Sequence, residues 1–577
     1  MDDNLRGVNF FGTDGIRGKT DTVDITPLDS LKLFRKSAVI TPALIELAVC
    51  AFTRLIGGVS ASLYVTGSDG RDSVTGNAFV SAMNKGFSRG GSNVRYLGVV
   101  PTPMVPQYQL ENDCLGGAML TASHNPSNQN GIKFFYKGKK LLPEGAIGDK
   151  ALSALMYEIA LQGPIHYENQ GMVENIDPME SVLKTLEKNI PVDGIKGARF
   201  ILDTAAGAWT RYADAFFTKA GLNYTRISAD EKGYNINHNC GVAEIEGHDF
   251  YQRSDIPYSP AIVRTMFENP DAYGIVTDGD GDRGMLLRYD KLSDSVCVYD
   301  GDLEAFLILG LLEKTGHKVN GSTIICTLES DIMASVSFAR KFNCEAIITD
   351  VGDKWICNCG KDDFSIGFES SGHVIIPMKL DCNQVLYSGN GLLTAVLSAA
   401  AMEQGCTIFE RGFSKTFYTY FVDKHLFGRE TSLFKDDSEM LFAKLKEVVK
   451  DTYHERRFKD NDVLAYEVIR DGLTVALIVS RNSGTEDKNA VYIKCIPELV
   501  DTLRPVAESL ARRHKEKMRN HELQELKIAN EILYQIKAKG EFVISEKQHS
   551  DTRLISVIHA LEREDLIKGD GTRFTSK

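Results

Sequence analysis

The chain of 577 residues lacks the long apolar segments of a membrane protein, and its first residues do not resemble the leader of an exported one. No apolar run reaches the roughly 18 residues that a membrane-spanning helix needs. The first fifteen residues, MDDNLRGVNFFGTDG, contain no basic stretch followed by an apolar core, so we expect no signal peptide. Hydrophobic residues make up 43% and charged residues 25%, which is typical of soluble globular proteins. We therefore expect a cytoplasmic protein without membrane contact, divided into about three to five domains.

A cysteine pattern for structural zinc is also lacking. The 11 cysteines are scattered, and although Cys357 and Cys359 lie close together, no second pair at metal-ligand spacing accompanies them. Structural zinc normally takes four ligands, so we interpret these thiols as buried or incidental. A reducing compartment fits that interpretation.

Positive charge is not in excess. The formal net charge of −12 argues against broad binding of nucleic acid, because such binding depends on phosphate neutralisation by lysine and arginine. It does not exclude an anionic substrate, since local basic groups and a bound metal can outweigh the field of the whole molecule.

Strand-like and helix-like stretches alternate along most of the chain. Residues 42–57 have apolar positions at helical spacing, and residues 62–72 indicate a strand that runs into a glycine-rich loop. Similar strand-to-loop units recur at 198–209, 273–283 and 364–373. This alternation predicts the α/β class, in which ligands bind beyond the carboxyl ends of strands. Polar motifs at four such positions predict loops that converge on one cleft.

After about residue 412 the pattern changes. Residues 472–495 indicate two strands that flank a loop, and a helix is predicted to follow through Arg513. The tail from about His521 is rich in lysine and glutamate, is predicted to be helical, and ends in the hairpin-like pattern DLIKGDGTRFTSK. One basic tail does not define a DNA-reading helix, so a packing or oligomer-contact role stays open beside a winged-helix-like one.

The motif DGDGDR, residues 278–283, indicates a metal site. Asp278, Asp280 and Asp282 alternate with glycines, which directs the three carboxylates to one side and lets the backbone curl around an ion. Hard oxygen ligands suit Mg²⁺. The alternative is a solvated acidic turn, but three carboxylates so close would repel one another without a cation. An EF-hand is excluded, because Arg283 and Tyr289 stand where that loop needs glycine and glutamate.

The stretch TASHNPSNQNGIKFF, residues 121–135, places Ser123 beside His124 and ahead of Lys133. One interpretation is a nucleophile on a loop, with neighbours that handle its proton and its charge. The other is a polar surface turn, because serine, asparagine, proline and glycine build turns for conformational reasons alone.

Two further loops carry residues suited to sugars and phosphates. The segment FESSGH, residues 368–373, presents Glu369, Ser371 and His373, whose polar groups can bind vicinal sugar hydroxyls or simply form a polar loop. The segment SRNSGTEDK, residues 480–488, can wrap phosphate oxygens or form an ordinary hairpin loop. Its candidate ligands are Arg481, Ser483, Gly484 and Thr485. Arg17 and Arg71, in glycine-rich loops, could likewise bind phosphate or form surface ion pairs.

The motifs TASHNP, DGDGDR, ESSGH and RNSGTE, in this order, resemble the α-D-phosphohexomutase superfamily over roughly residues 8–510. FGTDGIRG near the start and VGDKW at 351–355 look most like phosphoglucosamine mutases. The resemblance implies three related α/β domains and a smaller α+β domain around a central cleft, with Mg²⁺ as cofactor. The implied segments are a phosphoserine-bearing domain (1–175), a metal-binding domain (176–300), a sugar-recognition domain (301–411), a phosphate-binding α+β domain (412–518) and a helical C-terminal extension (519–577).

By this resemblance, Ser123 is the phosphoserine, and one of its oxygens completes the metal site of Asp278, Asp280 and Asp282. Glu369 and Ser371 resemble the residues that read the sugar hydroxyls. The loop that holds the non-reacting phosphate is matched by Arg481, Ser483, Gly484 and Thr485. Acid, base and charge-stabilising roles are expected near the reacting groups for Arg17, His124, Lys133, Arg283 and His373.

The implied reaction moves a phosphate from Ser123 to a hexose phosphate and takes the other phosphate back. Glucosamine 6-phosphate and glucosamine 1-phosphate are the leading pair, and a phosphomannomutase or phosphoglucomutase is the runner-up. A phosphatase with Asp278 as nucleophile and a retired sugar-phosphate sensor stay open. Asp487 and Ala490 depart from the family pattern, where proline and arginine are usual. Either the phosphate loop binds more weakly, or Lys488 or Lys494 substitutes for the missing arginine. We consider a homodimer as a candidate assembly.

Overall fold

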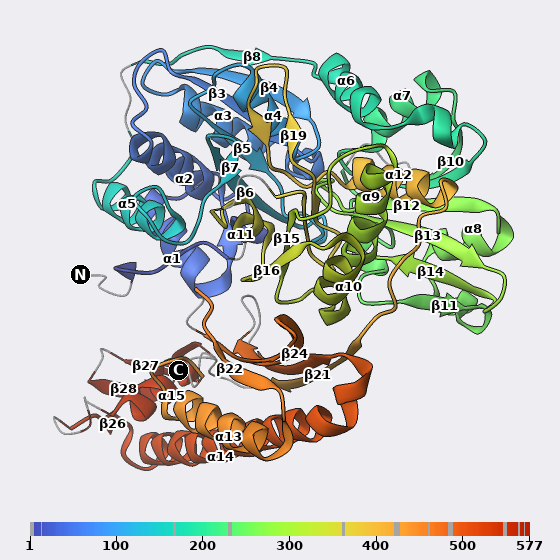
Figure 1. The fold of residues 1–577 in the computed structure, drawn as a ribbon. Coiled ribbons are helices and arrows are strands. Elements are labelled where there is room, and N and C mark those ends of the chain that lie inside the picture. Colours follow the sequence, from blue (N-terminus) through green and yellow to red (C-terminus); the bar gives the residue numbers. More distant parts are fainter. Residues whose placement is uncertain are drawn as a thin grey trace. The chain divides into compact units, whose positions relative to one another are not determined.

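The computed structural model describes residues 5–12, 14–165, 169–228, 233–360, 364–420, 427–459, 462–482, 488–545, 548, 551–563, 566–569 and 572–576 (Figure 1). The chain divides into two compact units, Met1–Arg411 and Gly412–Lys577. Within the described ranges, no helix has both the length and the apolar character that crossing a membrane requires.

The first sheet of the first unit has eight strands in the order β2-β1-β6-β5-β3-β4-β8, with β7 paired to β6. Strand β3 is parallel to β4 and β5, whereas β6 is antiparallel to both β5 and β1. The strands are β1 (Ile16–Thr20), β2 (Val39–Ile40), β3 (Leu63–Ser68), β4 (Asn93–Val99), β5 (Gly116–Leu120), β6 (Gln129–Tyr136), β7 (Lys139–Lys140) and β8 (Val173–Asn175).

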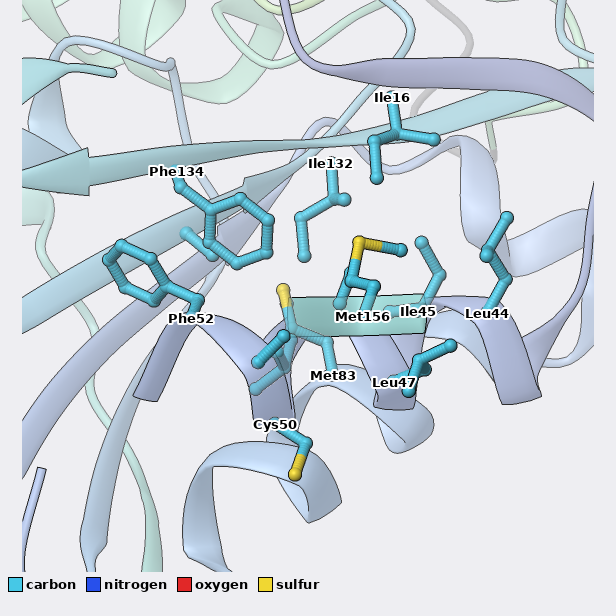
Figure 2. Close-up of a cluster of buried hydrophobic side chains, with 14 of the residues drawn as sticks. Ile16, Leu44, Ile45, Leu47, Cys50, Phe52, Met83, Ile132, Phe134 and Met156 are labelled. Carbon is cyan, nitrogen blue, oxygen red and sulfur yellow. The ribbon is translucent and has the colours of Figure 1, made fainter. Parts of the chain in front are cut away.

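Helix α2 anchors this sheet to its helical layer. Thr41 caps the helix by accepting the backbone N–H of Leu44, and Pro42 occupies the first turn, where its missing N–H costs nothing. Phe52 of α2 stacks on Phe134 of β6 with ring centroids 4.5 Å apart (Figure 2). The helices of this region are α1 (Pro27–Ser37), α2 (Pro42–Leu55), α3 (Ala78–Ser88), α4 (Met104–Glu111) and α5 (Asp149–Leu161). The helix predicted over residues 42–57 is confirmed.

The second sheet has six strands in the order β10-β9-β12-β13-β14-β11. Strand β9 is parallel to β10 and β12, and β12 forms an antiparallel hairpin with β13 across the motif DGDGDR. Its strands and helices are β9 (Arg199–Asp203), β10 (Asn223–Ser228), β11 (Phe250–Gln252), β12 (Ala272–Thr277), β13 (Gly284–Asp290), β14 (Ser295–Tyr299), α6 (Met179–Asn189), α7 (Thr210–Lys219) and α8 (Ala261–Glu268).

The third sheet has four strands in the order β16-β15-β17-β18, and a separate pair is formed by β19 and β20. Strand β15 is parallel to both of its neighbours. The elements are β15 (Thr323–Thr327), β16 (Glu345–Thr349), β17 (Ile366–Phe368), β18 (Val374–Ile375), β19 (Met378–Lys379), β20 (Val385–Leu386), α9 (Gly301–Lys314), α10 (Ile332–Phe342), α11 (Asp353–Cys357) and α12 (Gly391–Glu403). With three mixed sheets and their helices, the α/β class predicted for this part of the chain is confirmed.

The second unit contains a five-stranded antiparallel sheet in the order β21-β25-β24-β23-β22, with helices α13 and α14 packed against its strands. The elements are β21 (Phe413–Tyr420), α13 (Ser432–Val448), β22 (Thr452–Arg456), β23 (Val463–Arg470), β24 (Leu473–Asn482), β25 (Lys488–Cys495) and α14 (Val500–Lys539). The predicted pair of strands around residues 472–495 is therefore confirmed as β24 and β25.

Helix α14 differs from the prediction. It does not end at Arg513 but continues to Lys539, across the boundary expected at residue 518, and ends where Gly540 takes a φ of 83°. No glycine or proline follows Pro505 until that glycine, so nothing in the local sequence ends the helix earlier. Leu510 on its first half is buried, and Ile532 and Ile536 on its second half enter the core of the tail.

The tail forms its own small core around the end of α14. Strands β26 (Phe542–Val543), β28 (Arg573–Ser576) and β27 (Ile567–Gly569) form an antiparallel sheet in that order. Helix α15 (Thr552–Arg563) lies in the chain between β26 and β27. The predicted terminal hairpin is therefore present, and its buried Phe574 joins the core formed with Ile532 and Ile558.

Replacing Phe52 with alanine should lower the free energy of unfolding of the first unit by about 3–5 kcal/mol, because Phe52 is fully buried and its removal leaves a cavity. Urea denaturation followed by fluorescence or circular dichroism measures this loss. Arg54→Ala, an exposed position on the same helix, is the control and should change the value by less than about 0.5 kcal/mol. Equal effects of the two variants would contradict the role of this core.

Candidate active site

Ser123 lies in the loop that follows β5, and its hydroxyl meets the loop that follows β12. The Oγ of Ser123 donates a hydrogen bond of 2.7 Å to Oδ2 of Asp278, and Ser123 is fully buried. The backbone of Ser123 has a φ of 53°, which is uncommon for a residue other than glycine. A buried serine held in such a conformation requires support from its surroundings.

That support comes from three neighbouring side chains. The hydroxyl of Thr121 accepts the backbone N–H of Ser123 at 2.8 Å. The amide of Asn237 donates to the carbonyl of Ser123 at 2.7 Å, and the guanidinium of Arg71 donates to the same oxygen. Arg71 is 1% exposed and is paired with buried Asp69, so it forms no surface ion pair; it holds the serine loop in place.

Three aspartates of the β12–β13 loop form a compact buried group. Asp278, Asp280 and Asp282, called the acidic triad below, have ligand oxygens within 4.8 Å of one another. The N–H groups of Gly281 and Arg283 donate to Oδ1 of Asp278 at 2.9 and 3.2 Å. Burial and the other two carboxylates raise the pKa of Asp278 to about 7, whereas nearby cations, Lys133 first among them, hold the pKa of Asp280 and that of Asp282 below their usual range.

Gly281 makes the tight curl of this loop possible. Its φ is 72°, and a Cβ built on it would lie 2.2 Å from Cδ1 of Trp209. The indole N–H of Trp209 donates to the carbonyl of Gly281 at 2.9 Å. A larger residue at this position would therefore push the acidic triad away from Trp209.

Lys133 of β6 contacts two members of the acidic triad. Its Nζ lies 2.7 Å from Oδ2 of Asp280, 2.8 Å from Oδ2 of Asp282 and 2.9 Å from Oδ2 of Asp14. Burial would favour the neutral amine, but the three carboxylates outweigh it and raise the pKa of Lys133. The lysine is therefore charged at neutral pH.

The oxygens that Lys133 leaves free fit a divalent cation. Oδ1 of Asp280 is buried and has no hydrogen-bond partner among the described residues. Oδ1 of Asp282 lies 3.1 Å from Nε2 of His373 without hydrogen-bond geometry, and Oγ of Ser123 lies against Asp278. An all-oxygen set of this kind suits Mg²⁺, so the residues present fit the expected metal.

His373 and Glu369 connect the acidic triad to the loop after β17. Nδ1 of His373 lies 3.1 Å from Oε2 of Glu369, and Oε1 of Glu369 accepts the N–H of Gly352 at 2.8 Å. Burial disfavours the charged imidazole, but Asp282 and Asp353 outweigh it and raise the pKa of His373 to about 10. Ser371, expected beside Glu369 as a sugar ligand, is half-buried in the turn between β17 and β18.

His124 has the opposite electrostatic environment. The charge of Arg283, then burial, then the charge of Arg17 lower the pKa of His124 to about 3. Its Nδ1 is buried and has no hydrogen-bond partner in the described part of the chain. The imidazole is therefore neutral at physiological pH. Nη2 of Arg17 pairs with Asp14 at 3.0 Å, and Nε of Arg283 lies 3.9 Å from Oδ2 of Asp278.

The structure thus brings together ten of the predicted site residues from the first unit: Arg17, Ser123, His124, Lys133, Asp278, Asp280, Asp282, Arg283, Glu369 and His373. Arg481, at the end of β24, belongs to the second unit and faces Ala490 across the strand pair. Ser483, Gly484 and Thr485 lie outside the described residues.

Sequence reasoning missed four residues of this site. Asn237 is in no recognisable motif and is 114 positions from the serine whose carbonyl it contacts. Lys140 lies against the acidic triad with no local signal to mark it. Asp14 and Asp353 were within the stretches FGTDGIRG and VGDKW, but nothing in those stretches singles them out as partners of lysines.

Family models of two domains match the chain. The model described as phosphoglucomutase/phosphomannomutase, alpha/beta/alpha domain I, matches residues 8–153, and the model for alpha/beta/alpha domain III matches residues 300–412. A phosphoglucosamine mutase of Corynebacterium aurimucosum is 30% identical over 396 residues, 68% of this chain and 79% of the relative. The chain belongs to the α-D-phosphohexomutase superfamily.

Other relatives extend the match along this phosphohexomutase. A phosphoglucosamine mutase of Dictyoglomus turgidum is 28% identical over 487 residues, 83% of this chain and 92% of the relative. The open form of pp63/parafusin from Paramecium shares the fold with a TM-score of 0.64 at 17% identity, covering 88% of this chain and 95% of that one. A phosphoglucomutase/phosphomannomutase family protein of Burkholderia thailandensis has a TM-score of 0.60 at 18% identity and covers 87% and 98%.

For a phosphohexomutase, the geometry supplies what phosphoryl transfer requires of the protein. A neutral serine hydroxyl is a poor nucleophile and a poor leaving group, so cations and a proton acceptor must surround it. Lys133 and Arg283 place positive charge at the acidic triad, and the imidazole of His124, next to Ser123 in the chain, is neutral. The site combines these groups in a buried environment, where their charges act strongly.

Replacing Asn237 with alanine should lower the mutase activity, kcat/KM, by about 10- to 100-fold, because the Ser123 loop loses one of the donors that hold its strained backbone. A mutase assay with hexose phosphates and a bisphosphate primer measures the loss. Asn235→Ala, an exposed position two residues earlier, is the matched control and should retain wild-type activity. Wild-type activity in Asn237→Ala would remove this residue from the support of the loop.

Proposed function

We propose that this phosphohexomutase interconverts hexose 6-phosphate and hexose 1-phosphate through phospho-Ser123 and a sugar bisphosphate. Glucosamine 6-phosphate and glucosamine 1-phosphate are the proposed substrate pair. The observation that carries the proposal is the 2.7 Å contact between Oγ of Ser123 and Asp278 of the acidic triad, beside Oδ1 of Asp280, which has no hydrogen-bond partner among the described residues. Buried charges are costly to the fold, and a cluster of them beside a serine hydroxyl suits the transfer of a phosphoryl group.

In the first half of the reaction, the bond between phosphorus and Oγ of Ser123 breaks, and a bond from phosphorus to a sugar hydroxyl forms. The proton of that hydroxyl needs an acceptor, and neutral His124 is the candidate base on this loop. Oγ of Ser123 must gain a proton as it leaves, so the step balances when the proton taken from the sugar ends on Ser123. In the second half, the other phosphate returns to Ser123 by the reverse exchange. When bound, Mg²⁺ would neutralise charge that develops on the transferred group.

The remaining cations are assigned to binding and charge stabilisation. Arg17 and Arg283 carry guanidinium groups that suit phosphate oxygens, and imidazolium His373 can donate a hydrogen bond to an oxyanion. Lys133 stays protonated because its ammonium group contacts three carboxylates. These groups would hold the reacting phosphate while water is excluded from the site, which suppresses hydrolysis.

Glu369 and Ser371 are the proposed readers of the sugar. Both oxygens of Glu369 already accept a hydrogen bond, but each carboxylate oxygen has a second lone pair for a sugar hydroxyl. Because the bisphosphate must bind in two orientations, contacts midway around the ring are favoured. Arg481, together with Ser483, Gly484 and Thr485, is proposed to hold the non-reacting phosphate.

The preference for glucosamine phosphates is supported by relatives at about 30% identity that are named phosphoglucosamine mutases. We also infer that the three mixed sheets mark three related α/β domains, with the phosphate-binding domain and the winged-helix-like tail following. A phosphomannomutase or phosphoglucomutase is the alternative within the same chemistry. A phosphatase that uses Asp278 as nucleophile would carry phosphate on that aspartate instead.

The Ser123→Ala variant should lose turnover by about 10⁴-fold or more, the scale seen when a catalytic nucleophile is deleted. Thermal melting should show that the fold is retained. Trapping with labelled hexose bisphosphate should place phosphate on Ser123 of the wild-type protein, whereas label on Asp278 would support the phosphatase. Ser127→Ala, on the same loop, is the control and should turn over normally; near-normal mutase activity in Ser123→Ala would refute the proposal.

A coupled assay across glucosamine, glucose, N-acetylglucosamine and mannose phosphates, with the matching bisphosphate as primer, tests the substrate. Glucosamine 6-phosphate should give the highest kcat/KM. A higher value for mannose or glucose phosphate would assign the enzyme to the alternative specificity while leaving the phosphoserine chemistry in place.

A further inference from the structure

The ammonium group of Lys140 contacts carboxylates from three separate loops of the first unit. Its Nζ lies 2.7 Å from Oδ2 of Asp353, 3.2 Å from Oδ2 of Asp14 and 3.3 Å from Oδ2 of Asp282. The side chain of Lys140 is 7% exposed. Burial alone would lower its pKa, but the carboxylates outweigh this and raise it, so the group is charged.

Lys140 and Lys133 act on the same oxygen of Asp282. Oδ2 of Asp282 accepts hydrogen bonds from Lys133 at 2.8 Å and from Lys140 at 3.3 Å. Two ammonium donors on one oxygen restrict rotation of the carboxylate about its last bond. The other oxygen, Oδ1, therefore stays turned away from the lysines and lies 3.1 Å from Nε2 of His373, without hydrogen-bond geometry.

The same ammonium group of Lys140 is fixed by Asp353, the first residue of α11. The preceding residue, Gly352, donates its N–H to Oε1 of Glu369 at 2.8 Å. The ammonium group of Lys140 therefore contacts both the loop of the acidic triad and the segment whose Gly352 binds Glu369. The loop that bears Asp14 is the third attachment, since Asp14 is shared by Lys140 and Lys133.

We propose that Lys140 is a positioning residue that orients Asp282 for metal binding, with Asp353 as its anchor. The role deepens the proposed function, because it rests on a metal held by the acidic triad during phosphoryl transfer. Residues that orient metal ligands commonly change affinity for the metal by about 10- to 100-fold when they are removed. Lys140 would act through Asp282 and without touching substrate.

Two nearby lysines make matched controls. Lys139 is adjacent on β7, and its ammonium lies over the ring of Tyr387 at 4.8 Å. Lys354 borders the same small cavity as Lys140, is as deeply buried, and pairs with Asp149 at 3.0 Å. Replacing Lys354 therefore leaves a buried carboxylate without its lysine, as replacing Lys140 does, but the carboxylate is that of Asp149 and not that of Asp282.

The experiment measures Mn²⁺ binding to the full-length protein by electron paramagnetic resonance, without substrate. Lys140→Met should bind Mn²⁺ about 10- to 100-fold more weakly than wild type. Lys139→Met and Lys354→Met should stay within about 3-fold of wild type, and Lys140→Arg should recover part of the loss because it keeps the charge. The mutase assay should then show Lys140→Met losing activity that excess metal partly restores.

Wild-type Mn²⁺ affinity in Lys140→Met overturns the proposal, and so does an equal loss in Lys354→Met, which would indicate a general effect of a destabilised core. If Lys140→Met fails to fold, Asp353→Asn tests the same link, with Asp149→Asn as its control. Weaker Mn²⁺ binding in Asp353→Asn alone supports the proposal. Unchanged binding in Asp353→Asn overturns it.

This test separates the two proposals. A wild-type protein that isomerises no hexose phosphate, but in which Lys140→Met weakens Mn²⁺ binding, would refute the proposed function and leave the role of Lys140 intact. An active mutase whose Lys140→Met variant binds Mn²⁺ normally would refute the role of Lys140 and leave the proposed function intact.

Discussion

The site depends on balancing the negative charge of several carboxylates that the fold buries next to a serine hydroxyl. An unpaired buried charge is strongly unfavourable, and removing one partner of a buried pair typically costs about 3–5 kcal/mol. Here Lys133, Lys140 and His373 supply positive charge to the acidic triad from three different strands or turns. Among the described residues, Oδ1 of Asp280 still has no hydrogen-bond partner, which leaves an oxygen that suits one more cation. Metal binding and the architecture of the first unit are thus linked by charge balance.

The same reasoning explains the backbone around Ser123. Its left-handed conformation is maintained by donors to its carbonyl from Arg71 and Asn237, both of which are buried. Arg71 is itself neutralised by Asp69, so the support adds no net charge beside the acidic triad. The left-handed backbone of Ser123, the balanced charge around it and the apolar core beneath the sheet are therefore parts of one arrangement. The layer in which Phe52 stacks on Phe134 holds the strand that carries Lys133 (Figure 2).

Much of this could be predicted from short stretches of sequence. The acidic triad comes from alternate positions of one loop, and the pair Ser123–His124 is contiguous, so both are found without a structure, although the pair alone also fits a polar turn. Strand-to-loop patterns also predicted that the motifs lie at strand ends. In contrast, α14 runs past the expected end at Arg513, because helix-favouring residues continue beyond it. The two halves of this helix pack into different hydrophobic cores. A periodic pattern alone does not reveal that change of partner.

The sequence by itself determined the α/β class of the first unit, the elements that carry the motifs and the residue types able to transfer a phosphoryl group, because each depends on local spacing. Only the tertiary structure decided that Lys140 joins Asp14, Asp282 and Asp353, and that Asn237 supports a serine 114 positions away. Those contacts join segments that are far apart in the chain. No local pattern encodes them, because a buried ion pair is specified by which loops the packed sheets bring together.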